Sequence, residues 1–265
     1  MVFGERYRAS VWVMDGFLAV RFDFGTVGDF LFDPIILRAL WQTLRIATAA
    51  MLLGAAFGVV LAVMRQSRNP FAATIAGLYV WFWRATPVIL QLLMFYFGLR
   101  QLIEEEFFRD LWTRRNAAVV IFGLNEAAYM AEITRAGIKA VESGQMDAAR
   151  SLGMTNLQAM RRIILPQALR VMVPPTGNEF IAMLKNTSVA FAIGVVELLN
   201  AAKIQSARNF KVMELYTVAA FWYLVVVTGF SIVQAEVERI LAVGERDQPE
   251  TLFSRVISIL GARRA

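Results

Sequence analysis

The sequence predicts an all-α membrane protein with five transmembrane helices. Hydrophobic residues make up 58% of the 265 residues, and 20 Phe and 6 Trp are among them, whereas soluble domains usually contain about 45–50%. Five segments are long and apolar enough to cross a hydrocarbon core of about 30 Å, which takes roughly 20 residues of helix. A polar stretch with two helix signals separates the third segment from the fourth. Together these observations predict a helical bundle with one structured polar loop.

Composition excludes several kinds of chemistry. The chain has no Cys and no His, so it lacks thiol nucleophiles, disulfides, imidazole bases and the usual ligands of zinc and copper. The net charge is +6. In a protein this apolar, such an excess indicates loops beside anionic lipid rather than a surface for nucleic acid.

The five spans are expected at 36–64, 71–99, 117–137, 173–199 and 214–236. The first and last have long uncharged stretches, Ile46–Val63 and Leu215–Ala235. The three middle spans carry ionisable residues: Arg84 in the second, Glu126 and Glu132 in the third, and Glu179, Lys185 and Glu197 in the fourth. An ionisable group at bilayer depth costs about 2.5–3.5 kcal/mol or more. We therefore expect these side chains to face a cavity or a partner helix.

The two ends of the chain flank a membrane domain expected at 35–242. Residues 1–34 form an N-terminal extension, in which the apolar stretch Val11–Val20 would span only about 15 Å as a helix. That stretch has no cleavage-site pattern, so we interpret it as an interfacial helix and not a signal peptide. Arg and Lys are slightly more frequent on the side that carries the tail 243–265. This bias favours an extracytoplasmic N-terminus and a cytoplasmic tail, although the margin is too small to decide by itself.

The polar loop, about 142–166, contains signals for two short helices. Ser143 can cap the first, and Gly153 can end it in the left-handed conformation. Thr155 with Gln158 three residues later forms the pattern of a capping box for the second helix. The loop is therefore predicted to form two helices that meet at an angle.

The second loop helix is amphipathic. Its apolar residues recur at helical spacing: Leu157, Met160, Ile163 and Ile164. Arg161 and Arg162 point elsewhere, so one face of a polar loop is apolar. Such a face suits a groove on a partner protein. Two alternatives remain: the helix could lie on lipid, or it could pack back onto its own bundle.

Three stretches resemble a known family. The chain reads Ala-Tyr-Met-Ala-Glu-Ile-Thr-Arg-Ala-Gly-Ile from Ala128 and continues to Asp-Ala-Ala-Arg-Ser-Leu-Gly, which ends at Gly153. The second span contains Arg84-Ala85-Thr86-Pro87 before Gln91, and the fourth contains Leu184-Lys185-Asn186-Thr187-Ser188. In these stretches it resembles the membrane subunit of ABC-type importers for polar amino acids, the permease family of histidine, glutamine and glutamate uptake systems.

The resemblance covers about residues 37–240, and its departures are mild. Asp147 stands where the loop signature usually opens with Glu. Ala85 and Ala136 replace common glycines, and Val189 replaces a common Leu. Each departure keeps the charge or the size class.

The resemblance implies the five-transmembrane-helix fold of a type I ABC importer permease with a cytoplasmic coupling-helix loop. This loop would insert into a cleft on the ATPase over about 147–162. The residues implied in ATPase coupling are Asp147, Ala148, Ala149, Leu152, Gly153, Leu157, Met160 and Arg161.

The fourth span supplies most candidates for substrate binding. Pro174, Pro175 and Gly177 predict a broken helix beside a cavity. Asn178 and Lys185 are seven residues apart and share one helix face, while Glu179 lies on the next. The candidates are Arg84, Asn178, Glu179, Lys185, Thr187 and Ser188.

An amino-acid zwitterion requires both signs of charge. Lys185 with the hydroxyl of Thr187 or Ser188 can hold the carboxylate, and Glu179 can hold the ammonium. Alternatively, these charges pair with each other, or with Arg84 or Glu132, and simply hold the bundle together.

The chain lacks a site for ATP. None of its lysines, Lys139, Lys185, Lys203 and Lys211, follows a glycine, as a phosphate-binding loop requires. It is therefore expected to be a permease without enzymatic activity, metal or cofactor of its own. ATP and Mg would be bound by a partner ATPase dimer.

The resemblance further implies a second permease subunit, identical or paralogous, and an extracytoplasmic solute-binding protein or domain. The substrate would be a polar amino acid of the glutamate, glutamine or basic class, and the location the bacterial cytoplasmic membrane. Alternatives are an ABC permease for another small polar solute, a scaffold that merely docks a partner, and an ion-coupled secondary carrier. A carrier should show a second copy of the 174–188 pattern, which we do not find in the sequence.

Overall fold

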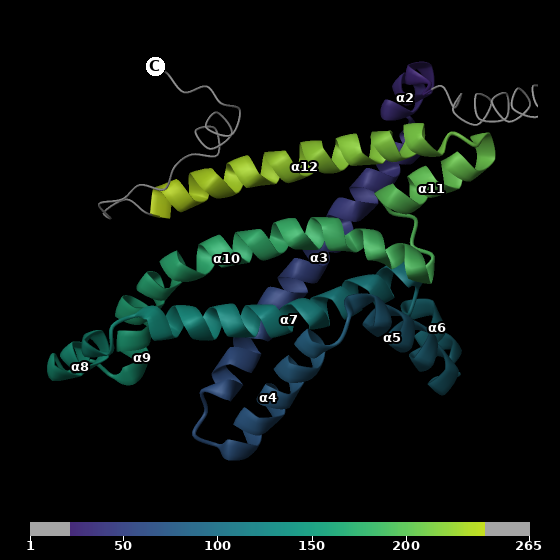
Figure 1. Cartoon of the computed structure of the whole chain (residues 1–265). Helices are drawn as coiled ribbons and strands as arrows, with labels where there is room; N and C mark the ends of the chain where they lie inside the picture. Colours follow the sequence, from purple (N-terminus) through teal and green to yellow (C-terminus); the bar gives the residue numbers. More distant parts are fainter. Residues whose placement is uncertain (1–21, 242–265) are drawn as a thin grey trace, which may run out of the picture.

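The computed structural model describes residues 22–241 and, within that range, consists of helices, turns and loops without strands (Figure 1). The predicted all-α class is confirmed. The apolar stretch 11–20 and the tail 243–265 lie outside the described residues.

Three helices are each long and apolar enough to cross a membrane: α3 (Pro34–Arg65), α7 (Arg114–Ala140) and α12 (Val212–Leu241). Two bent pairs also pass this test. The first joins α4 (Pro70–Ala85) to α5 (Val88–Leu102), and the second joins the helical segment Asn156–Ile193 to α11 (Leu198–Asn209). If each bent pair is one span, the total reaches the five that the sequence predicts.

The remaining helices are short. Helices α2 (Phe24–Leu31) and α6 (Glu106–Leu111) precede α3 and α7, and α8 (Ser143–Ser151) and α9 (Asn156–Ala159) form the polar loop. Figure 1 places α8 and α9 at one end of the bundle and α6 and α11 at the other. The polar loop therefore projects from one end of the bundle, which we call the loop end.

Glycines allow α3 and α7 to cross in close contact. A Cβ added to Gly58 would lie 2.5 Å from the Cβ of Met130, and one added to Gly54 would lie 2.6 Å from the Cβ of Glu126. Small residues four apart are the usual means by which membrane helices approach closely. The pair Gly54-x-x-x-Gly58 is thus a sequence signal for this crossing, which the hydropathy of the span does not reveal.

The second predicted span, 71–99, is not one straight helix. Helices α4 and α5 meet at an angle of 108°, because Thr86 precedes a proline and is held in the extended conformation. The Trp83 carbonyl at the bend accepts hydrogen bonds from Gln91 Nε2 at 2.9 Å and Asn125 Nδ2 at 3.0 Å. Asn125 also donates to Gln91 Oε1 at 2.9 Å. Since Asn125 belongs to α7, this bond network anchors the bend to the centre of the bundle.

The predicted break at Pro174, Pro175 and Gly177 is wrong. Helix α10 (Leu165–Asn186) runs through both prolines without interruption. A Cβ on Gly177 would clash with Gln234 of α12, and Gln234 Nε2 donates to the Pro174 carbonyl at 3.2 Å. This close contact with α12 supports the helix where the prolines remove backbone donors.

The conformation changes further along the same segment. After α10 the chain forms a 3₁₀ helix, η2 (Thr187–Ile193), and stops at Gly194, which has a φ of 78°. The irregular part of the fourth span therefore follows Lys185 instead of preceding it.

The substitution Gly58→Ala is expected to destabilise the protein by about 1–3 kcal/mol, the usual cost of overpacking. The added methyl would meet Met130 and the Ala127 carbonyl on α7. The measurement is thermal unfolding in detergent. Gly229→Ala is the matched control because α12 has open space there. Equal stability of the two variants would contradict the role of this helix crossing.

Candidate functional site

The polar loop has most of the predicted local structure. Gly153 ends α8 with a φ of 80°. Thr155 Oγ1 accepts from the Gln158 amide at 3.3 Å, and Gln158 Oε1 accepts from the Thr155 amide at 2.9 Å, so the capping box is confirmed. The predicted Ser143 cap is wrong, because α8 begins at Ser143 itself and Glu142 precedes it without a side-chain capping bond.

The second loop helix is not a separate element. Helix α9 continues through a π-helical segment, η1 (Met160–Ile164), directly into α10. The loop and the fourth span therefore form one continuous helical rod from Asn156 to Asn186. A displacement of the loop would move the start of that span with it.

The apolar face of the loop divides into a buried and an exposed part. Ala149, Ala159 and Ile164 are buried, where α8 and α9 pack against each other and against η1. Leu152 and Leu157 are 82% and 76% exposed. We call these two leucines the leucine pair. The leucine pair therefore forms an exposed apolar patch on the polar loop.

The other residues predicted to contact an ATPase lie in the same polar loop as the leucine pair. Asp147 is exposed and pairs with Arg150 on its own helix at 3.6 Å. Ala148, Gly153 and Arg161 are also exposed, Met160 is half-buried, and Ala149 is buried. The loop thus presents most of the predicted contact surface outward.

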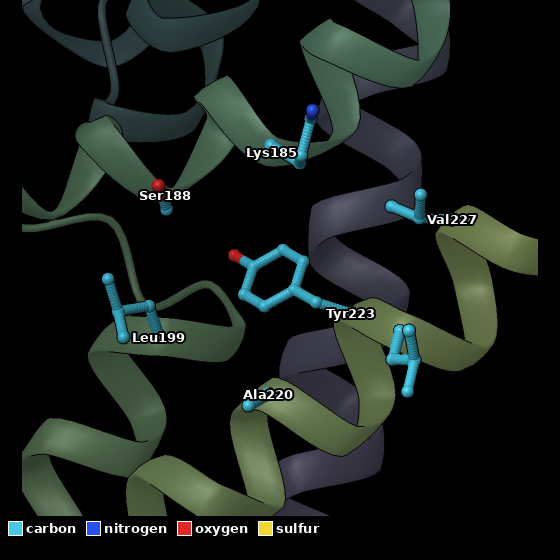
Figure 2. Close-up of a pocket in the computed structure, with 7 residues that line it drawn as sticks. Lys185, Ser188, Leu199, Ala220, Tyr223 and Val227 are labelled. Atoms are coloured by element: carbon cyan, nitrogen blue, oxygen red, sulfur yellow. The ribbon is translucent and has the colours of Figure 1, made fainter. Parts of the chain in front are cut away.

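A cavity of about 480 Å³ lies between the end of α10, η2, α11 and α12 (Figure 2). We call it the Lys185 cavity. Lys185 and Ser188 line one side, and the Tyr223 ring extends between them and Leu199. Its other lining residues are apolar: Ala220, Leu224 and Val227. Among residues 22–241, Lys185 is therefore the one charged residue in this lining.

Tyr223 was not among the sequence candidates. Its hydroxyl donates to Glu197 Oε2 at 3.0 Å. Glu197 is fully buried and accepts from the amides of Leu199 and Asn200 at 2.9 and 2.8 Å, which caps α11. Because Tyr223 and Glu197 come from different helices, no local sequence pattern signals their contact.

The other candidates of the fourth span do not line this cavity. Thr187 is buried, and its hydroxyl donates to the Leu184 carbonyl at 2.8 Å. Asn178 Oδ1 accepts from Gln234 Nε2 at 3.1 Å. Glu179 is half-buried and lies near enough to Glu126 and Arg84 for their charges to interact. In this conformation the structure brings together Lys185 and Ser188 only.

Arg84 lines a second cavity, of about 400 Å³, between α3, α4 and α7. We call it the arginine cavity. Its lining includes Arg65 and Glu132, which form an ion pair, and Tyr129, whose ring centroid is 5.3 Å from the Arg84 guanidinium. Arg135 also pairs with Glu132, at 2.6 Å. Glu132 thus joins α7 to α3 through Arg65. None of the ion pairs of residues 22–241 involves Lys185, Glu179 or Arg84, so the alternative pairing from the sequence is not found.

Known proteins share both the sequence and this architecture. The chain is 41% identical over 209 residues to the probable amino-acid permease protein YxeN of Bacillus subtilis, covering 79% of this chain and 92% of that protein. It is also 41% identical over 243 residues to the arginine transport system permease protein ArgU of Corynebacterium glutamicum, covering 89% and 76% of the two chains.

A solved structure described as an amino acid ABC transporter with histidines is similar, with a TM-score of 0.74 and 36% identity over 84% of this chain and 99% of that one. The resemblance expected from the motifs is therefore confirmed over most of the chain. The family model for the inner membrane component of binding-protein-dependent transport systems matches residues 54–242. The chain belongs to this family of ABC importer permeases.

Proposed function

We propose that this protein moves a polar amino acid across the cytoplasmic membrane while a separate ATPase subunit supplies the energy. One observation carries the proposal: the exposed Leu157 lies on a helical rod that runs without a break from Asn156 into α10, which bears Lys185. A force applied to the loop would therefore reach the Lys185 cavity.

The proposal places the loop end of the bundle on the cytoplasmic side, because ATP is hydrolysed there. The N-terminus of α3 would then be extracytoplasmic and the end of α12 cytoplasmic. The basic residues of the loop support this orientation, since cytoplasmic loops carry an excess of Lys and Arg. ATP and Mg would be bound by the ATPase dimer, and this chain would need no cofactor.

The full transporter would contain a second permease subunit, identical or paralogous, and an extracytoplasmic solute-binding protein. The family description itself, a binding-protein-dependent system, supports the last partner. A bundle of up to five spans seldom encloses a full path for a solute, which supports the second permease. The partners named here follow from the family and from these physical arguments.

The Lys185 cavity would receive the carboxylate of the amino acid. The Lys185 ammonium supplies the positive charge, and the Ser188 hydroxyl supplies a further hydrogen bond. A volume of about 480 Å³ lies within the roughly 300–1,000 Å³ of typical small-molecule sites.

Glu179 would hold the ammonium only after a movement of α10, because it lies on another face of that helix. Arg84, Asn178 and Thr187 have no contact with this cavity in the present conformation. The proposal therefore assigns them no contact with the substrate here. The names of the similar proteins, which mention arginine and histidines, support a basic amino acid as the first substrate to assay.

The substitution Leu157→Glu is expected to weaken ATPase binding and to reduce uptake at least tenfold, because a charged side chain replaces one of the two leucines of the leucine pair. The measurements are co-purification of the ATPase in detergent and uptake of labelled amino acid in cells. Leu111→Glu is the matched control, since Leu111 is an exposed leucine at the opposite end of the bundle. Full ATPase recovery with Leu157→Glu would contradict the coupling role.

The substitution Lys185→Ala is expected to reduce transport roughly tenfold or more, as the loss of a charge-assisted hydrogen bond predicts. Assembly with the ATPase should be unchanged, and Lys185→Arg should restore part of the activity. The measurement is uptake in proteoliposomes. Lys203→Ala serves as the control, because Lys203 contacts the Phe191 ring outside the cavity. Unaltered uptake by Lys185→Ala would show that the carboxylate binds elsewhere.

A further inference from the structure

The arginine cavity carries more positive than negative charge. Arg65 and Arg84 line it, and the charges of Arg84 and Arg135 both act on Arg65. Within the described part of the chain, Glu132 is the one carboxylate in the lining, and it already accepts from Arg65 and Arg135. Among the ion pairs of residues 22–241, none involves Arg84, and Glu179 is its carboxylate neighbour on α10. The Arg84 guanidinium therefore has donors left for an anion.

The mouth of this cavity is bordered by exposed apolar side chains. Trp81, in the lining, is 67% exposed. Gly77, also in the lining, has open space where a side chain would begin. The large apolar side chains nearby in sequence, Leu78 on α4 and Val63 on α3, are exposed as well. Exposed apolar side chains on membrane spans contact acyl chains, and Trp prefers the level of the headgroups.

The cavity lies in the half of the bundle that carries the polar loop. Arg65 is the last residue of α3. Glu132 precedes the end of α7 by eight residues, or about 12 Å of helix. Long arginine side chains near helix ends extend toward the headgroups, so the Arg65 guanidinium is within reach of the membrane surface.

We propose that the arginine cavity binds the headgroup of an anionic phospholipid. Arg65 and Arg84 bind the phosphate oxygens, for which a planar guanidinium offers paired donors. One acyl chain follows the open space at Gly77 beside Trp81. A zwitterionic amino acid suits the cavity less well, because its ammonium would meet guanidinium groups and a carboxylate that is already doubly paired. Basic pockets between membrane helices favour anionic lipid for the same electrostatic reason.

The test is native mass spectrometry of the full-length chain in complex with its ATPase, in detergent with equal amounts of phosphatidylglycerol and phosphatidylcholine. The wild type is expected to retain phosphatidylglycerol preferentially. Arg84→Gln should lower this retention roughly fivefold, the effect expected for one basic residue near anionic lipid. Gly77→Leu should lower it as well by filling the cavity without changing its charge. Arg109→Gln, on the exposed helix α6 at the other end, should retain lipid like the wild type.

Competition distinguishes the sources of the anion. Neither inorganic phosphate nor free arginine or glutamate, each at millimolar concentration, should displace the lipid. Displacement by phosphate would indicate a site for soluble phosphate, and displacement by an amino acid a substrate site; either result would overturn the proposal. Equal retention of the two lipids, or unchanged retention in both Arg84→Gln and Gly77→Leu, would overturn it too. If the Arg84→Gln variant does not assemble with the ATPase, the retention of phosphatidylglycerol by Gly77→Leu is the deciding measurement.

Discussion

The structure depends on one constraint of the bilayer: a backbone group that leaves a helix must find a partner inside the protein, since no water is available. The bend between α4 and α5 meets this constraint by polar side chains, because Gln91 and Asn125 donate to the Trp83 carbonyl. Gln234 of α12 adds a hydrogen bond to the Pro174 carbonyl of α10. The side-chain amides of Asn125 and Gln234 belong to α7 and α12. Their hydrogen bonds therefore connect the bend of the second span to the third span, and the proline segment of α10 to the fifth span.

The same constraint explains how a loop can act on a distant cavity. Membrane helices that pack through glycines, as α3 and α7 do, form a close-packed interior with little room for independent adjustment. Helix α10 lies against this core and carries the polar loop at its start and Lys185 near its end. A load on the leucine pair is then transmitted as motion of a helix, while local unwinding would leave backbone groups without partners.

The two cavities that carry the proposals differ in their charge and surroundings. Lys185 lies in one cavity, next to hydroxyls and apolar side chains. Arg65 and Arg84 line the other, with Glu132 and aromatic rings. The first suits a single carboxylate, whereas the second suits a more strongly anionic group at the membrane surface. Separate sites would allow lipid composition to affect the bundle without competing with the transported solute.

The sequence by itself determined the membrane class, the number of apolar segments and part of the local structure of the loop. Capping at Thr155 and the turn at Gly153 depend on residues three or four apart, so both can be recognised from the sequence without knowledge of the tertiary structure. Only the tertiary structure decided that α10 continues through its prolines, that the second span bends by 108°, and that Tyr223, not Asn178 or Arg84, joins Lys185. Those outcomes depend on contacts between helices far apart in the chain, and helical periodicity specifies a face but not the neighbour that the face will meet.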